Sequence, residues 1–82
     1  MNDRQKSIVV IGAGNRANKY LEYVIRNRQK VKLVGVVEPV DLRRERVAEK
    51  FNIKPSNCFT GYEQFFAAKI QADAVFICTP VS

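Results

Sequence analysis

The sequence predicts an α/β fold built around a parallel β-sheet. Apolar, β-branched runs of strand length alternate with segments whose apolar residues recur at three- and four-residue steps, in the order strand, helix, strand, helix, strand, helix, strand. Glycine and proline bound several of these runs, as expected where strands end and turns begin. With 82 residues, the chain forms at most one small domain or one part of a larger one.

The first half of the chain contains two strand patterns and two helix patterns. Ser7 to Ile11 is a continuous apolar run that ends at a glycine, as expected for a strand buried on both faces. From Asn15 to about Gln29 the apolar residues recur at helical steps, with polar residues on the other side. Val31 to Glu38 is a second β-branched strand, and Asp41 is well placed to cap a helix that runs to about Phe51.

The second half continues the alternation. Cys58 to Thr60 is a short candidate strand, and the next segment has one apolar face made by Tyr62, Phe65, Phe66 and Ile70. Asp73 to Pro80 is a fourth strand, stopped by proline. Right-handed crossovers then predict the spatial order third, second, first, fourth, with the first two helices on one face and the third on the other. The direction in which successive strands are added to the sheet reverses between the first and fourth strands. Open α/β sheets bind ligands at such a point.

The glycines that follow the first strand lie at that point. Gly12 can adopt backbone angles that a side chain would forbid, which allows a tight turn out of the strand. Gly14 lacks a β-carbon, so a pyrophosphate can approach the main chain, and a helix beginning near Asn15 points its free N–H groups at the phosphates. Ala17 takes the third position of the G-x-G-x-x-G/A fingerprint of dinucleotide-binding loops. The alternative is a plain strand-to-helix turn.

Glu38 ends the second strand at close to the expected spacing of roughly 20 residues after the glycines. Its carboxylate can accept hydrogen bonds from both ribose hydroxyls of an adenosine and would repel a 2′-phosphate, so we expect NAD to bind in preference to NADP. Arg43 and Arg44 follow closely. Either a solvated helix face or a contact with a 2′-phosphate would account for them.

Composition excludes several other functions. The net charge of +6 is spread along the chain without interleaved aromatic residues, so no nucleic-acid partner is expected. No stretch is long and apolar enough to cross a membrane, and the first residues lack the apolar core of a secretory signal, so we expect a cytoplasmic protein. There is no histidine, and Cys58 and Cys78 are far apart, so a metal site lacks ligands and a disulfide is not expected.

Together, "VVIGAGNRANKY", "LVGVVEP" and "ADAVFICTP" resemble the beginning of the oxidoreductase family that includes glucose–fructose oxidoreductase, inositol dehydrogenase and MocA-type proteins. A Tyr-Glu pair, Tyr62 and Glu63, adds to the resemblance, which covers nearly the whole chain. It implies a partial Rossmann fold: residues 1–82 would be the N-terminal part of an NAD(P)-binding domain, with about four parallel strands in the order 3-2-1-4 and helices on both faces.

The resemblance also implies a set of cofactor contacts. It adds Thr79 and Pro80, which match a segment near the pyrophosphate and the nicotinamide ribose, although Pro80 could equally be a strand terminator. Arg16 matches a position that is often arginine in family members with this loop, and its alternative roles are a phosphate contact and a solvent-facing residue of the first helical turn. The expected NAD site therefore comprises Gly12, Ala13, Gly14, Asn15, Arg16, Glu38, Thr79 and Pro80.

The resemblance implies no catalytic residue in this chain, because the family's Glu-Lys-Pro motif and substrate domain would follow Ser82. We therefore expect a non-catalytic, NAD-binding fragment of an enzyme that transfers hydride between a sugar- or polyol-like substrate and nicotinamide. The alternative is a stand-alone module that senses a nucleotide or contacts proteins. The strand from Ala74 to Cys78 has neither proline nor charge. An exposed edge of this kind predicts self-association, most simply as a homodimer.

Overall fold

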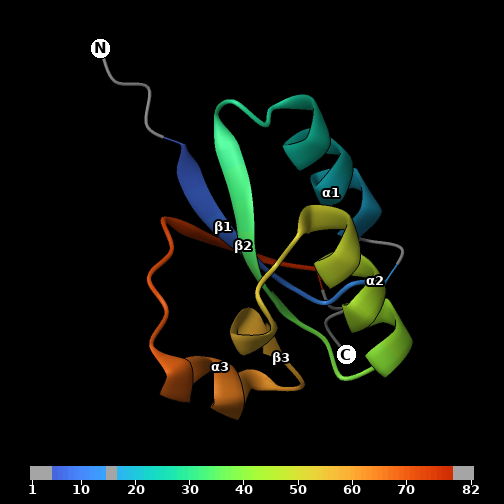
Figure 1. The fold of residues 1–82 in the computed structure, drawn as a ribbon, viewed down its shortest axis with the longest axis vertical. Helices are drawn as coiled ribbons and strands as arrows, with labels where there is room; N and C mark the ends of the chain where they lie inside the picture. The colour runs from blue at the N-terminus through green and yellow to red at the C-terminus, as the bar shows by residue number, and fades with distance from the viewer. Residues whose placement is uncertain (1–4, 15–16, 79–82) are drawn as a thin grey trace.

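The computed structural model describes residues 5–14 and 17–78. Its sheet has four parallel strands in the order β3-β2-β1-β4, which confirms the predicted topology (Figure 1). The strands are β1 (Lys6–Ile11), β2 (Val31–Val37), β3 (Cys58–Phe59) and β4 (Ala74–Ile77). The helices are α1 (Ala17–Arg26), α2 (Asp41–Phe51) and α3 (Tyr62–Ala68), with a short 3-10 turn at Pro55–Asn57.

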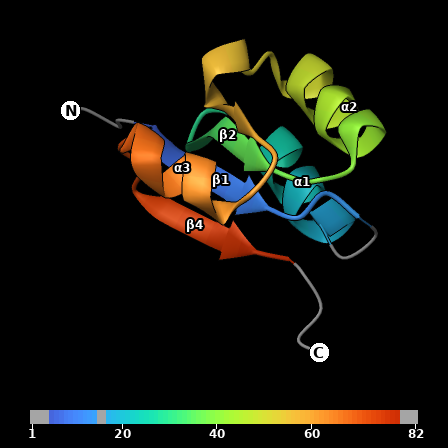
Figure 2. The same cartoon turned by 90° about the horizontal axis from the view of Figure 1, so that it is seen from below.

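The helices cover both faces of the sheet, as predicted. Helices α1 and α2 lie on one side of the sheet and α3 on the other (Figure 2). The buried side chains of α1 and α2 join one apolar cluster, whereas Phe65 of α3 joins another. Strand β1 separates the two clusters: Ile8 and Val10 belong to the first, and Val9 and Ile11 to the second. Because alternate residues of a strand point to opposite faces, a strand buried on both faces must be apolar throughout. That explains the continuous apolar run in the sequence.

Strand β2 contains an irregularity beside Gly35. Its register with β1 shifts where Ile8 and Val9 pair with Leu33 and Gly35, which leaves Val34 without a partner in β1. The Asn57 side-chain amide donates a hydrogen bond of 2.9 Å to the Val34 carbonyl oxygen. The turn before β3 therefore supplies a hydrogen bond at the point where the strand pairing is interrupted.

Two local predictions need correction. Asp41 does not cap α2: it is the first helical residue, the N-cap is Val40, and no side chain caps this end. The Asp41 carboxylate instead pairs with Arg44 one turn later, at 2.6 Å. Helix α1 ends at Arg26, earlier than expected, because residues 27–30 form a turn, in which the Asn27 side chain donates to the Tyr23 carbonyl oxygen at 2.8 Å.

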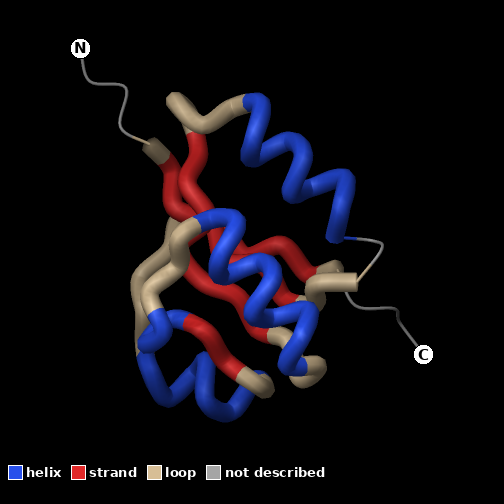
Figure 3. The backbone as a smooth tube through the Cα atoms, turned by 45° about the vertical axis from the view of Figure 1, so that its right-hand side comes forward, coloured by secondary structure: helices blue, strands red, loops and turns tan. Residues whose placement is uncertain are grey.

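The carboxyl ends of β1 and β2 lie side by side, because Ile11 pairs with Val37. From this end the chain turns back, so that α1 and α2 run over the sheet towards the opposite end (Figure 3). The loops that follow β1 and β2 therefore meet at one edge of the molecule. This is the edge that the sequence predicts for the ligand.

Candidate functional site

The first component of the site is the turn after β1. Gly12 is buried and has a φ of 94°, a backbone conformation that residues with a side chain rarely adopt. Its N–H donates a hydrogen bond of 2.7 Å to the Val37 carbonyl oxygen, so the turn stays attached to β2. The predicted reason for a glycine at this position is confirmed: a side chain here would strain the backbone where the chain leaves β1.

Gly14 meets a different requirement. An added β-carbon would lie 3.3 Å from the Arg43 Nη1 atom, and its other neighbour within 4 Å among residues 5–14 and 17–78 belongs to the same flexible side chain. The fold itself therefore does not require glycine at this position, whereas a ligand that approaches the main chain would. The Ala17 N–H donates to the Gly14 carbonyl oxygen at 3.0 Å, and Ala17 is fully buried, so its small side chain fits where α1 packs on the sheet.

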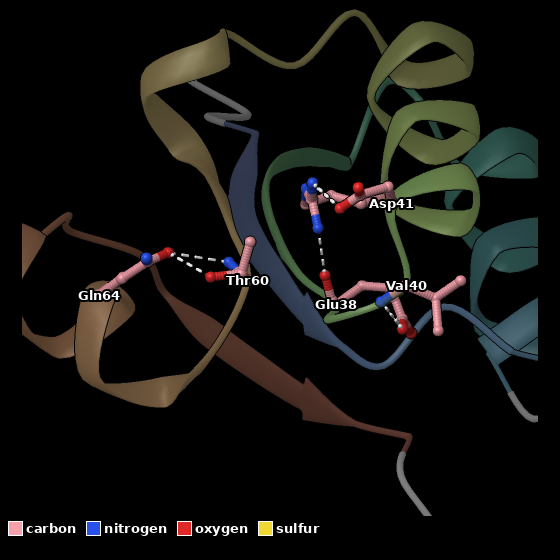
Figure 4. A network of polar contacts seen from close by, with 6 residues as sticks. Glu38, Val40, Asp41, Thr60 and Gln64 are labelled. Carbon is pink, nitrogen blue, oxygen red and sulfur yellow. Dashed lines mark hydrogen bonds and ion pairs between the residues drawn. The ribbon is translucent and has the colours of Figure 1, made fainter.

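Glu38 connects this turn with the loop that follows β2. Its side chain is buried, with 4% exposed, yet both carboxylate oxygens are hydrogen-bonded. The Ala13 N–H donates to Oε1 at 2.7 Å. The Val40 N–H donates to Oε2 at 2.8 Å (Figure 4). A carboxylate oxygen can accept more than one hydrogen bond, so hydroxyl groups of a ligand could still bind here.

The two arginines of α2 are held differently. Arg44 is mostly buried, pairs with Asp41, and donates from Nη1 to the Glu38 carbonyl oxygen at 2.8 Å (Figure 4). Arg43 is exposed, and its guanidinium lies beside Gly14. Of the two cations that the sequence left as alternatives, Arg44 thus stabilises the start of α2, and Arg43 is the one beside the glycine turn. The sequence did not predict that role for Arg44, although a basic residue three positions after Asp41 is a recognisable helix pair.

The end of β3 adds a third connection to this edge. The Glu38 N–H donates to the Phe59 carbonyl oxygen at 2.8 Å. Beyond it, the Thr60 N–H and hydroxyl both donate to Gln64 Oε1, at 2.9 and 2.8 Å, which fixes the entry to α3 (Figure 4). The carboxyl ends of three neighbouring strands are thus tied together by hydrogen bonds from short loops.

The structure brings four of the predicted cofactor residues together: Gly12, Ala13, Gly14 and Glu38. The other four, Asn15, Arg16, Thr79 and Pro80, lie outside the described residues. The arrangement fits a dinucleotide because it combines a turn whose backbone favours glycine, a second glycine that the described neighbours do not require, and a buried carboxylate beside the turn.

The described part of the chain has no candidate metal site and no activated thiol. Among residues 5–14 and 17–78, no cluster of His, Cys, Asp or Glu could hold a metal ion, and no helix could span a membrane. Both cysteines are free. Burial raises the pKa of the Cys78 thiol, and it raises that of Cys58 as well, where the positive charge of Arg44 opposes the effect. Because the thiolate is the reactive form, neither thiol is set up as a nucleophile.

Comparison with known proteins identifies the family. Residues 6–82 match the model of the GFO_IDH_MocA family, described as an oxidoreductase family with an NAD-binding Rossmann fold. The chain belongs to this family. This GFO_IDH_MocA chain therefore has the NAD-binding fold that its glycine turn and Glu38 predicted, and the resemblance read from the sequence is confirmed. No curated protein sequence matches the chain.

Solved structures agree on the fold. The family member superposes on the WlbA dehydrogenase from Chromobacterium violaceum, in complex with NADH and UDP-GlcNAcA, with a TM-score of 0.83 and 19% identity; 98% of this chain and 22% of that one are covered. The WlbA dehydrogenase from Bordetella pertussis, also in complex with NADH and UDP-GlcNAcA, gives a TM-score of 0.81 and 16% identity, with 98% and 23% covered. The chain thus spans about a fifth of the length of these dehydrogenases.

Proposed function

We propose that the turn after β1 and the end of β2 bind the adenosine and pyrophosphate part of NAD. The observation that carries this proposal is the 2.7 Å hydrogen bond between Ala13 and Glu38, which brings the glycine turn and the acidic strand end into one site. In the proposed complex, Gly12, Ala13 and Gly14 form the phosphate-facing turn, and Glu38 accepts the ribose hydroxyls. Four residues outside the described ranges, Asn15, Arg16, Thr79 and Pro80, complete the proposed set of contacts.

The same carboxylate sets the cofactor preference. A 2′-phosphate would bring negative charge next to Glu38, which is buried and therefore poorly screened by water. Arg43 lies near enough to the turn to attract a phosphate, but the repulsion between Glu38 and a 2′-phosphate remains. NAD is therefore the proposed cofactor in preference to NADP.

We propose that residues 1–82 are the N-terminal part of an NAD(P)-dependent oxidoreductase, which transfers hydride between a sugar- or polyol-like substrate and nicotinamide. Membership of the oxidoreductase family supports this proposal, as do the two similar dehydrogenases that hold NADH. When bound, NAD supplies the hydride chemistry; these residues hold and orient it. We assign no catalytic residue within this chain. The two free cysteines support a cytoplasmic location.

Isothermal titration with NAD and NADP tests the cofactor proposal. The unaltered chain should bind NAD more tightly than NADP. Glu38→Ser should weaken NAD binding, by about tenfold or more if one charged hydrogen bond of roughly 1.5–3 kcal/mol is lost, and should reduce the discrimination against NADP. Glu45→Ser, at an exposed position of α2, is the control and should change neither affinity. Tighter binding of NADP by the unaltered chain would contradict the proposal.

We also propose that the chain self-associates through β4, most simply as a homodimer. This strand lies at one edge of the described sheet, and Val75 and Ile77 are 43% and 66% exposed. An apolar edge strand without charge or proline favours pairing with a second copy. Sedimentation velocity at micromolar concentration measures the association, and a strictly monomeric chain would contradict it.

A further inference from the structure

We propose that Glu38 holds the glycine turn in its binding conformation before any cofactor arrives. Recognition of the ribose is the role that the proposed function gives to this residue. Positioning of the turn is a second and separate role, and it belongs to the cofactor-free protein. Only the consequence for cofactor affinity rests on the proposed function.

The backbone of this turn needs a restraint, because glycines flank its middle residue. Ala13 lies between Gly12 and Gly14, and glycine has more backbone freedom to lose on folding than any other residue. Within the described turn, the Gly12 N–H bonds to β2 and the Gly14 carbonyl bonds to α1. The Ala13 N–H lies between these two anchors, and its hydrogen bond goes to the Glu38 carboxylate. That contact is therefore the side-chain restraint on the middle of the turn.

The second oxygen of the same carboxylate fixes the carboxylate itself. It accepts the Val40 N–H at 2.8 Å, at the point where α2 begins without a side-chain cap. The two short bonds thus link the β1–α1 turn to the β2–α2 loop through one rigid, planar group. Burial of this group to 4% exposure strengthens the bonds, because water competes little for them.

Glutamate satisfies both donors, one with each carboxylate oxygen. Glutamine offers a single acceptor oxygen and would direct its NH₂ donors at one of the two N–H groups. Aspartate is one methylene shorter, and serine is shorter still and uncharged. A replacement that removes the repulsion of a 2′-phosphate therefore also releases the turn. We accordingly expect Glu38→Ser to lose NAD affinity without a matching gain in NADP affinity.

Nuclear magnetic resonance of the ¹⁵N,¹³C-labelled chain without ligand tests the positioning role. A scalar coupling across the hydrogen bond between the Ala13 amide nitrogen and the Glu38 carboxylate carbon is expected in the unaltered chain. In Glu38→Gln, hydrogen exchange at the Ala13 amide should become about tenfold faster or more, as expected when a hydrogen bond to a charged group is lost. Glu45→Gln removes the same charge at an exposed site of α2 and should leave the Ala13 exchange rate unchanged.

The outcomes separate this proposal from the proposed function. Exchange at the Val9 amide in the buried centre of β1 reports whether a variant is folded. If Glu38→Gln fails to fold, the coupling in the unaltered chain still decides, and its absence overturns the proposal. An unchanged Ala13 exchange rate in a folded Glu38→Gln variant overturns it too. If the coupling is present but the unaltered chain does not bind NAD, the proposed function fails and the positioning role stands.

Discussion

At the scale of single residues, the two glycines of the turn serve different purposes. Gly12 has a φ of 94° and is buried, so any side chain here strains the backbone. Among the described residues, an added β-carbon at Gly14 would come within 4 Å of the flexible Arg43 side chain alone. The fold therefore depends on Gly12, and the proposed ligand depends on Gly14.

Valine at each position should separate these purposes. Gly12→Val should lower the free energy of unfolding by about 1–3 kcal/mol, the usual cost of a side chain held in a sparsely populated backbone region. Gly14→Val should unfold at nearly the same denaturant concentration as the unaltered chain but lose NAD binding, because a branched side chain occupies the approach of the pyrophosphate. Urea denaturation and titration calorimetry measure the two effects. Undiminished NAD affinity in a folded Gly14→Val variant would refute the site.

At the scale of elements, β2 gives a prediction about packing. An added β-carbon at Gly35 would lie 3.1 Å from Ile70 Cδ1, 3.2 Å from Val9 Cγ2 and 3.3 Å from the Asn57 carbonyl oxygen. One of these neighbours is backbone, so the site cannot relax freely. Gly35→Ala should destabilise the chain by about 1–3 kcal/mol, as overpacked cores do, although alanine usually suits a strand better than glycine. Gly61→Ala, with open space around it, is the control for urea denaturation.

Helix α2 gives a prediction about the two arginines. Arg43→Ala should weaken binding of both NAD and NADP, because the exposed guanidinium lies beside the turn that we propose faces the pyrophosphate. Arg44→Ala should instead lower the free energy of unfolding, because that side chain connects Asp41 with the Glu38 carbonyl. Titration calorimetry and urea denaturation distinguish them. A loss confined to NADP in Arg43→Ala would assign this residue to the 2′-phosphate.

The sequence predicted elements better than their ends. Burial on two faces requires apolar runs such as that of β1, so the strands and their order could be read directly. Helix starts depend on local competition for N–H groups, which periodicity does not report. Aspartate is a residue type that often caps helices, yet the Asp41 carboxylate pairs with Arg44, and the nearby Val40 N–H donates its hydrogen bond to Glu38. The position of Glu38 directly after β2, beside the glycine turn, was predictable from its spacing, but its bonds to Ala13 and Val40 depend on how two loops meet.

At the scale of the whole molecule, the crossover connections bring the candidate site residues together at the carboxyl ends of the strands. Helices α1 and α2 both begin there because each follows the carboxyl end of its strand, and α3 begins beside them after β3 (Figures 1 and 3). The opposite end of the strands has a cavity of about 390 Å³, lined in part by Val24, Leu33 and Phe51, that contains no residue of the glycine turn. The presence of a cavity therefore does not by itself locate the proposed site, which the hydrogen bonds of Glu38 indicate instead.

The exposed edge of β4 gives the last prediction. Phe76 faces the α1 side, where its ring lies 5.1 Å from that of Tyr20 and packs against the core, so its replacement would disturb folding as well as association. Ile77 is 66% exposed and provides the cleaner test. Ile77→Lys should raise the dissociation constant of the proposed dimer by about tenfold or more, since burying one such side chain contributes roughly 1.5–3 kcal/mol.

Leu42→Lys, equally exposed but on α2, is the matched control and should leave the association unchanged. Sedimentation velocity measures both variants at the same micromolar concentrations. Equal effects of the two lysines would mean that general surface charge, and not the β4 edge, governs self-association.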